Sequence, residues 1–173
     1  MPKRYVRTFS RCFPAYHPKA GQPTYFVEKI WKSVGVPKYH IDGIDYMALA
    51  SNIIEPKHHT IRAGHWFKPG DIIIPKVWML PGGRFTKGNK QIQFAPDIEV
   101  KKTWNFEVVD LDGVQCMRIN NEPFGQFHPL VENLKQLAKN DGLTAIELIQ
   151  WFSNPSPVGK QYQIICWNDS INY

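Results

Sequence analysis

The clearest structural signal in this sequence is a run of alternating apolar and polar residues over positions 98–109. Its apolar positions are Ile98, Val100, Trp104, Phe106 and Val108. Because successive side chains of a strand point to opposite faces, this period of two predicts a strand with one buried face. Asp112-Gly113 follows and predicts a tight hairpin turn into a second strand over 114–119. The chain is therefore expected to contain an antiparallel sheet.

Further strands are expected over 5–13, 72–78, 91–95 and 162–167. Pro75 lies inside the second of these and predicts an edge position or a bend, because proline cannot donate a ladder hydrogen bond. Helices are expected over 24–34, 44–54, 130–138 and 144–152. The first would begin with Thr24 as N-cap, and the last with a capping box of Thr144 and Glu147. This order of elements predicts an α+β fold built round a small, curved sheet or barrel.

Length and composition indicate one soluble globular domain. The chain has 173 residues, of which 43% are hydrophobic and 21% are charged. No apolar run approaches the roughly 18 residues of a membrane span, and the start lacks the apolar stretch of a secretory signal. A cytoplasmic location and no membrane partner are therefore expected. The net charge of +6 permits a polyanionic partner such as RNA.

Polar residues concentrate between Lys57 and Asp71, directly before a run of three isoleucines. A turn that delivers polar groups to the start of a strand is a common way to build a small-molecule or phosphate site. The three histidines of the segment suggest a metal, but His58 and His59 would point to opposite faces of an extended chain. No second ligand motif supports them, and the three cysteines of the chain are widely spaced. No metal and no cofactor are therefore expected.

The same segment carries a family resemblance. The run Lys57-x-x-Thr60-Ile61-Arg62, followed by Phe-Lys-Pro-Gly-Asp at 67–71, resembles the signature of ASCH domains, relatives of the PUA RNA-binding fold. Within that family the chain is most similar to small bacterial amidohydrolases that remove the acetyl group from N4-acetylcytidine. Their acid–Asn–Met–Thr stretch before a helix resembles residues 141–144 here. The resemblance covers about 56–78 and 98–167.

This resemblance implies a PUA-like (ASCH) curved sheet or barrel with flanking helices in a single domain, 1–173. Residues 1–55 would form an N-terminal strand and helical extension. Residues 56–173 would form the barrel core, with an insertion at 79–97.

The resemblance also implies site residues. A Lys, a Thr and a Glu carry the reaction in the similar amidohydrolases, and the matching positions here are Lys57, Thr60 and Asp141. A desolvated lysine can accept a proton from water or from the threonine hydroxyl. Thr60 would act as nucleophile or orient the water, and the acid would protonate the leaving amine. Asp141 departs from the family pattern, because its side chain is one methylene shorter than that of Glu.

Two functions are compatible with these motifs. The first is an amidohydrolase that deacylates an N-acylated nucleoside or a related small amide. The second is a non-catalytic module that binds RNA or a modified nucleotide. In both, the ligand is expected to contact Arg62, His59, Trp66, Lys102 and Trp104.

Overall fold

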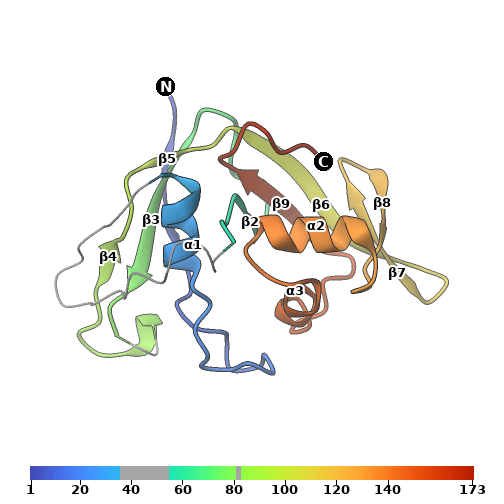
Figure 1. Cartoon of the computed structure of the whole chain (residues 1–173), viewed down its shortest axis with the longest axis horizontal. Coiled ribbons are helices and arrows are strands. Elements are labelled where there is room, and N and C mark those ends of the chain that lie inside the picture. Colours follow the sequence, from blue (N-terminus) through green and yellow to red (C-terminus); the bar gives the residue numbers. More distant parts are fainter. Residues whose placement is uncertain (36–54, 81–82) are drawn as a thin grey trace.

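The structure is a computed structural model that describes residues 1–35, 55–80 and 83–173. It is an α+β fold, as the sequence predicts, with two sheets and three helices in these ranges. The helix expected over 44–54 lies outside the described residues. Figure 1 shows the two sheets side by side, with the helices lying across them.

The first sheet has four strands. They are β1 (Arg4–Thr8), β3 (Ile72–Trp78), β4 (Gln91–Gln93) and β5 (Ile98–Glu99). β1 pairs in parallel with β3, so the N-terminal residues take part in the sheet. β3 has strands on both sides, so of the two alternatives expected from Pro75 the edge position is wrong. Its second neighbour changes from β5 to β4 at this residue, and the Pro75 carbonyl accepts from the Phe94 N–H at 3.1 Å. The missing proline N–H therefore falls where the ladder is already interrupted.

The second sheet has five antiparallel strands in the order β2, β9, β6, β7, β8. Their bounds are β2 (His59–Ala63), β6 (Lys102–Leu111), β7 (Val114–Ile119), β8 (Glu122–Gln126) and β9 (Gln161–Cys166). The β6–β7 hairpin is confirmed, with positive φ at Asp112 (52°) and Gly113 (83°). β8 was not predicted, because Glu-Pro-Phe-Gly-Gln has no alternation. Across the described residues neither sheet closes on itself, so the structure does not show a barrel.

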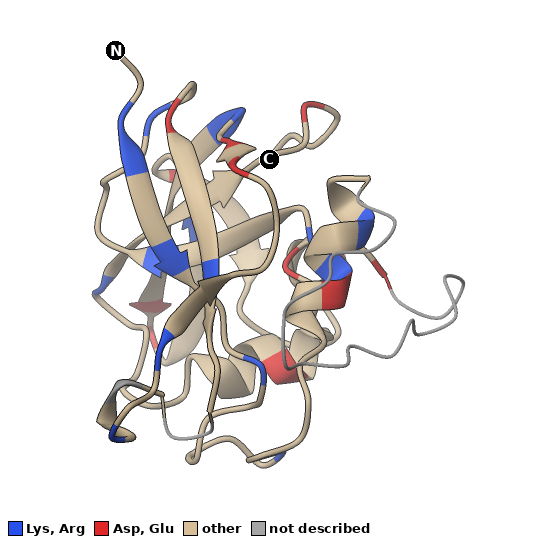
Figure 2. Ribbon diagram, turned by 90° about the vertical axis from the view of Figure 1, so that its left-hand side faces the viewer, with Lys and Arg blue, Asp and Glu red and all other residues tan. Residues whose placement is uncertain are grey.

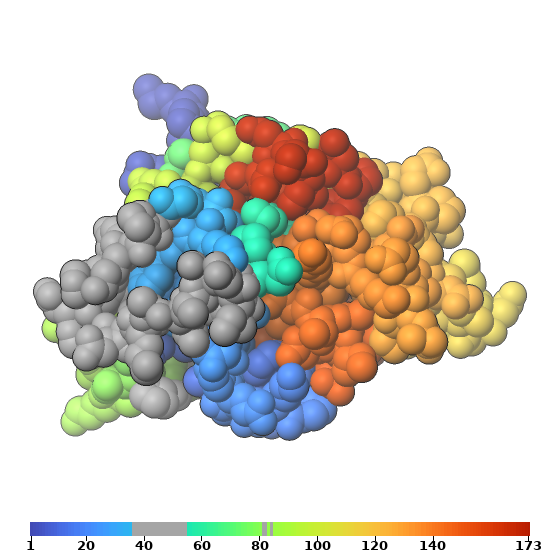
Figure 3. All heavy atoms as spheres, in the orientation of Figure 1, coloured from blue at the N-terminus to red at the C-terminus, as the bar shows by residue number. Residues whose placement is uncertain are grey.

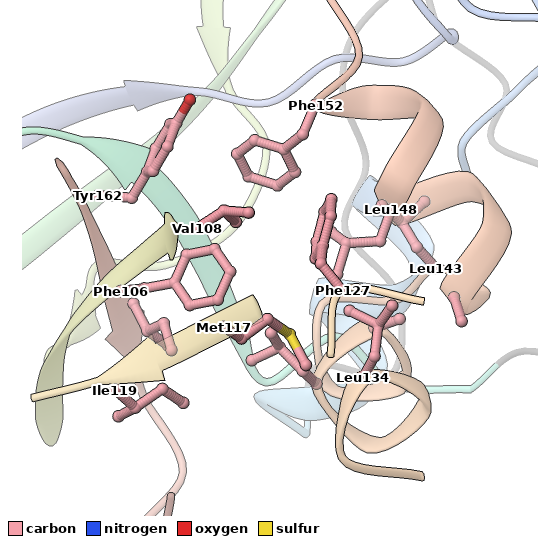
Figure 4. Close-up of a cluster of buried hydrophobic side chains, with 14 of the residues drawn as sticks. Phe106, Val108, Met117, Ile119, Phe127, Leu134, Leu143, Leu148, Phe152 and Tyr162 are labelled. Carbon is pink, nitrogen blue, oxygen red and sulfur yellow. The ribbon is translucent and has the colours of Figure 1, made fainter. Parts of the chain in front are cut away.

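β9 is buried on both faces and separates two hydrophobic cores. We call the cluster under α2 and α3 the helix-side core and the cluster between the sheets the sheet-side core. Ile164 belongs to the helix-side core, whereas Ile165 belongs to the sheet-side core. Figure 4 shows the helix-side core, where Phe106 and Met117 face Leu134 and other helix residues.

The helices follow the predicted positions with small shifts. They are α1 (Phe26–Ser33), α2 (Glu132–Asn140) and α3 (Ala145–Trp151), and a short 3₁₀ turn, η1, spans Gly83–Phe85. The capping box of Thr144 and Glu147 is present at α3. Thr24 does not occupy the N-cap of α1. Tyr25 does, with φ 57°, while the Thr24 hydroxyl accepts from the Phe26 N–H at 3.3 Å.

Replacing Leu137 with alanine tests the helix-side core. Leu137 is fully buried in α2, so Leu137→Ala should lower the free energy of unfolding by about 2–5 kcal/mol. Leu130 is 76% exposed just before the same helix, and Leu130→Ala is the control that should change little. Equilibrium denaturation in urea measures both. Equal effects of the two substitutions would contradict the placement of α2.

Candidate functional site

Residues 57 and 58 run between α1 and the end of α2. The Lys57 N–H donates to the Lys29 carbonyl of α1 at 3.1 Å, and the His58 N–H donates to the Asn140 carbonyl of α2 at 2.7 Å. In Figure 3 the first teal residues accordingly lie between the blue and the orange segments, below the red C-terminal segment. The start of β2 is therefore fixed from both sides by backbone hydrogen bonds.

The structure brings Lys57 and Asp141 into direct contact. The Lys57 Nζ donates to the Asp141 Oδ1 and to the Asp141 carbonyl oxygen, both at 2.6 Å. It also lies 4.3 Å from the centroid of the Phe26 ring, a cation–π distance. Lys57 is 1% exposed and Asp141 is 7% exposed. The ion pair is thus enclosed, with an aromatic ring on one side of the ammonium.

Burial lowers the pKa of Lys57 to about 8. Loss of hydration disfavours the ammonium and is the largest cause, and the positive charges of Arg62 and Lys29 act in the same direction. The negative charge of Asp141 and its hydrogen bond to the ammonium raise the pKa of Lys57, but by less than burial and the positive charges lower it. A neutral amine is therefore accessible close to physiological pH, which a proton acceptor requires.

The turn between α2 and α3 places Asp141. The Leu143 N–H donates to the Ala138 carbonyl and the Gly142 N–H to the Lys139 carbonyl, each at 2.9 Å, which is the Schellman pattern. Gly142 has φ +75°, and a Cβ there would lie 3.2 Å from the Lys57 Cβ, so glycine is required on both grounds. The sequence Asn-Asp-Gly therefore ends α2 and also turns the Asp141 carboxylate toward Lys57.

Two lysines cap this end of α2. Lys57 binds the Asp141 carbonyl, and the Lys29 Nζ donates to the Gly142 carbonyl at 2.6 Å. These carbonyls have no partner within the helix, and the helix dipole places negative potential there. Lys57 therefore has a structural role in addition to any chemical one. Sequence reasoning missed Lys29 and Phe26, which appeared only as members of the α1 helix.

Thr60 lies on the other face of β2 from the helix-side core. It pairs with Ile165 of the sheet-side core, whereas its neighbour Ile61 packs against the helix-side core. Thr60 is buried, and among the described residues its hydroxyl makes no hydrogen bond to Lys57 or Asp141. The structure thus joins two of the three expected catalytic residues.

Arg62 shares the face of Thr60 by the alternation of the strand. Its Nη2 donates to the Thr8 carbonyl of β1 at 3.1 Å, and its Cζ lies 5.3 Å from the centroid of the Phe9 ring. Its Nε is enclosed and has no hydrogen-bond partner among the described residues. Burial lowers the pKa of Arg62, and the negative charge of Asp141 opposes this effect. Arg62 therefore lies within electrostatic reach of the ion pair without contacting it.

His59 is fully buried and neutral. Burial lowers the pKa of His59 to about 4, against the attraction of Asp141. Its Nε2 lies 3.0 Å from the Leu137 carbonyl, which can only accept, so the ring proton is on Nε2. Nδ1 is then a bare acceptor, enclosed and without a partner in the described chain. The Tyr173 hydroxyl also lies 3.5 Å from the His59 Nε2.

Lys102 and Trp104, both expected to contact a ligand, hold the C-terminal segment in the structure. The Lys102 Nζ donates to three oxygens, on Asp169, Ile171 and Asn172, at 2.6–2.9 Å. The Trp104 ring lies 5.1 Å from that of Tyr173, edge to face. Lys102 and His59 both pair with Cys166, so they lie in one row across the sheet. The C-terminal segment therefore covers the part of the sheet assigned to the ligand.

Trp66 is the most exposed of the residues expected to bind a ligand, at 65%. Its backbone is fixed: the N–H of Trp66 donates to the Gln163 side chain at 3.2 Å, and the Tyr5 hydroxyl donates to its carbonyl at 3.1 Å. Its indole lies over Gly64, where a Cβ would be 2.2 Å from Nε1. This exposed ring is thus held in one place, at the opposite end of β2 from Lys57.

Comparisons with protein-family models, with curated proteins and with solved structures found no match for this chain. Within the described ranges, no group of three or more His, Cys, Asp or Glu residues is placed to hold a metal ion. The helices of these ranges are all too short or too polar to span a bilayer.

Removing the carboxylate of Asp141 should leave Lys57 buried without a counter-charge. We expect Asp141→Ala to lower the free energy of unfolding by about 3–5 kcal/mol at pH 7. The loss should shrink at pH 10, where Lys57 is neutral and needs no partner. Glu132, which is exposed in α2 and pairs with Lys135, gives the control Glu132→Ala, for which we expect little change. Denaturant titrations at the two pH values measure the free energy of unfolding. A loss of equal size at both pH values would contradict the assignment of Lys57 as charged at pH 7 and neutral at pH 10.

His59 should make the protein sensitive to acid. Between pH 6.5 and about 4 the unfolded chain binds a proton at this residue and the folded chain does not, so stability falls as the pH falls. His59→Gln should remove part of this decline, as measured by denaturation at pH 7, 5.5 and 4.5. His65→Gln, at an exposed position, is the matched control and should keep the decline. A decline unchanged in His59→Gln would mean that His59 is protonated in the folded state.

Proposed function

We propose that this protein is an ASCH-like hydrolase that deacylates an N-acylated nucleoside base, with Lys57 and Asp141 as its proton-transfer pair. The observation that carries the proposal is the direct contact of Lys57 with the acid that follows α2. That is the pairing which the resemblance to the amidohydrolases of N4-acetylcytidine implies. The two curved sheets would correspond to an opened form of the PUA-like barrel.

The chemistry follows from the position of the two groups. Neutral Lys57 takes a proton from a water molecule, whose oxygen attacks the acyl carbon and forms a C–O bond. Because the Lys57 ammonium is hydrogen-bonded to the Asp141 carboxylate, the pair can pass that proton to the amide nitrogen of the leaving base. The C–N bond then breaks, giving a carboxylate and the free amine.

Water, rather than Thr60, is the nucleophile in this scheme. Thr60 is not hydrogen-bonded to Lys57, so nothing in the described structure activates its hydroxyl. Its role in the proposal is to orient the substrate or the water from the sheet-side face of β2. Asp141 also suits the reaction despite its shorter side chain, because the Schellman turn brings it within 2.6 Å of the amine.

Release of cytidine and acetate from N4-acetylcytidine, followed by chromatography, tests the proposal. The rate should increase with pH through about 8, because Lys57 must lose its proton before it can accept one. Lys57→Met and Asp141→Asn should each lower the rate by about 10²-fold or more. Lys135→Met, at an exposed position of α2, is the control and should keep the full rate.

A second function competes with the first. Trp66 is exposed and its backbone is hydrogen-bonded, an arrangement that suits a ring on which a base stacks and favours a non-catalytic RNA-binding module. Absence of acetate release together with salt-dependent binding of oligocytidylate would replace the hydrolase proposal with this one.

A further inference from the structure

Two arginines, one on an edge strand of each sheet, have no carboxylate partner in the part of the chain that the structure describes. Arg62 of β2 donates to the Thr8 carbonyl at 3.1 Å, and Arg7 of β1 donates to the Val6 carbonyl at 3.0 Å. Among the described residues, neither forms an ion pair with an Asp or a Glu. Since Arg62 bonds to the residue that follows Arg7, the two side chains belong to one region between the sheets.

Aromatic rings hold both guanidinium groups. The Arg7 Cζ lies 4.7 Å from the centroid of Phe67 and 5.6 Å from that of Tyr5. The Arg62 Cζ lies 5.3 Å from that of Phe9. An arginine stacked on a ring keeps the N–H groups at its edge available for other partners. Both residues are half-buried and so remain accessible to a ligand, while the Arg62 Nε is enclosed and unpaired.

The charges in this region do not balance. Arg62 is exposed to the positive charge of Arg7 and to the negative charge of Asp141, which is already bonded to Lys57. Arg7 and Arg62 repel each other, and burial lowers the pKa of both. Burying unpaired cations is costly, so an anion that binds between them would be stabilised. Figure 2 shows that β1 is basic at both of its ends.

We propose that Arg62 and Arg7 form a phosphate subsite on the sheet-side face of β2, on the other side of this strand from the Lys57–Asp141 pair. Guanidinium groups bind phosphate oxygens through parallel hydrogen bonds, and two of them can hold one phosphate in a fixed position. The statement about the substrate rests on the proposed function. Given that function, the substrate is a phosphorylated nucleoside or a nucleotide of RNA, and not a free nucleoside. The phosphate would anchor the ligand on the sheet-side face of β2.

Inorganic phosphate is the first probe, compared with chloride at equal ionic strength. Phosphate should raise the melting temperature of the full-length protein, and calorimetric titration should give a saturable affinity. Arg62→Met and Arg7→Met should each weaken that affinity by about tenfold or more. Arg118→Met is the control, because Arg118 pairs with Glu107 at 3.7 Å on β6 and β7, and it should bind phosphate as the wild type does.

Nucleotide probes then distinguish the two sources of phosphate. Cytidine monophosphate should bind about tenfold more tightly than cytidine, and Arg62→Met should abolish this difference. If the phosphate belongs to RNA, a short oligocytidylate should bind more tightly still; if it belongs to a free nucleotide, the oligonucleotide should gain nothing.

Two results would overturn the subsite. One is a wild-type protein that phosphate neither stabilises nor binds. The other is a phosphate effect that persists in Arg62→Met and Arg7→Met, which would place the anion elsewhere. Without phosphate, Arg62→Met should be at least as stable as the wild type, since an unpaired charge is removed; a large loss of stability would show instead that Arg62 is structural. These measurements do not use acetate release, so the failure of the subsite and of the hydrolase can be told apart.

Discussion

The buried ammonium of Lys57 is the interaction on which the arrangement of this molecule depends. It joins α1, through Phe26, to β2 and to the turn between α2 and α3, through Asp141. An isolated ammonium in such a place would cost far more than a domain of this size can offset. The carboxylate, the end of a helix and an aromatic face together reduce that cost. Burial still leaves the amine with a lowered pKa, so the contact that stabilises the fold also suits the proposed chemistry.

β9 separates the two hydrophobic cores that border β2. Because both of its faces are buried, the five-stranded sheet has a core on each side, and its edge strand β2 borders both. Lys57 lies toward the helices, whereas Thr60 and Arg62 lie toward the first sheet. The functional residues of β2 are therefore divided between two environments. The helix-side environment holds the Lys57–Asp141 ion pair, proposed to transfer protons, and the sheet-side environment holds the arginines proposed to bind phosphate.

Local sequence signals predicted the local structure well. Asp112-Gly113 forms the expected hairpin, and Thr144 with Glu147 forms the expected helix start. The single strand expected over 98–109 is only partly confirmed, because β5 (Ile98–Glu99) lies in the first sheet and β6 begins at Lys102 in the second. Predictions that depended on neighbours were less successful. Pro75 lies in a strand with partners on both sides, because the ladder changes partner at that residue. Lys102 and Trp104 contact the C-terminal segment, which no local pattern indicates, and their contact with a ligand stays a prediction.

The sequence by itself determined the fold class, the β6–β7 hairpin and the bounds of the three described helices to within two residues. Those features depend on hydrophobic period and turn chemistry, which act over a few neighbouring residues. Only the tertiary structure decided that Lys57 contacts Asp141, 84 residues away, and that Arg62 reaches β1 beside Arg7, with no carboxylate of the described residues paired to either arginine. Burial and charge balance arise when distant segments pack, so neither can be inferred from local patterns.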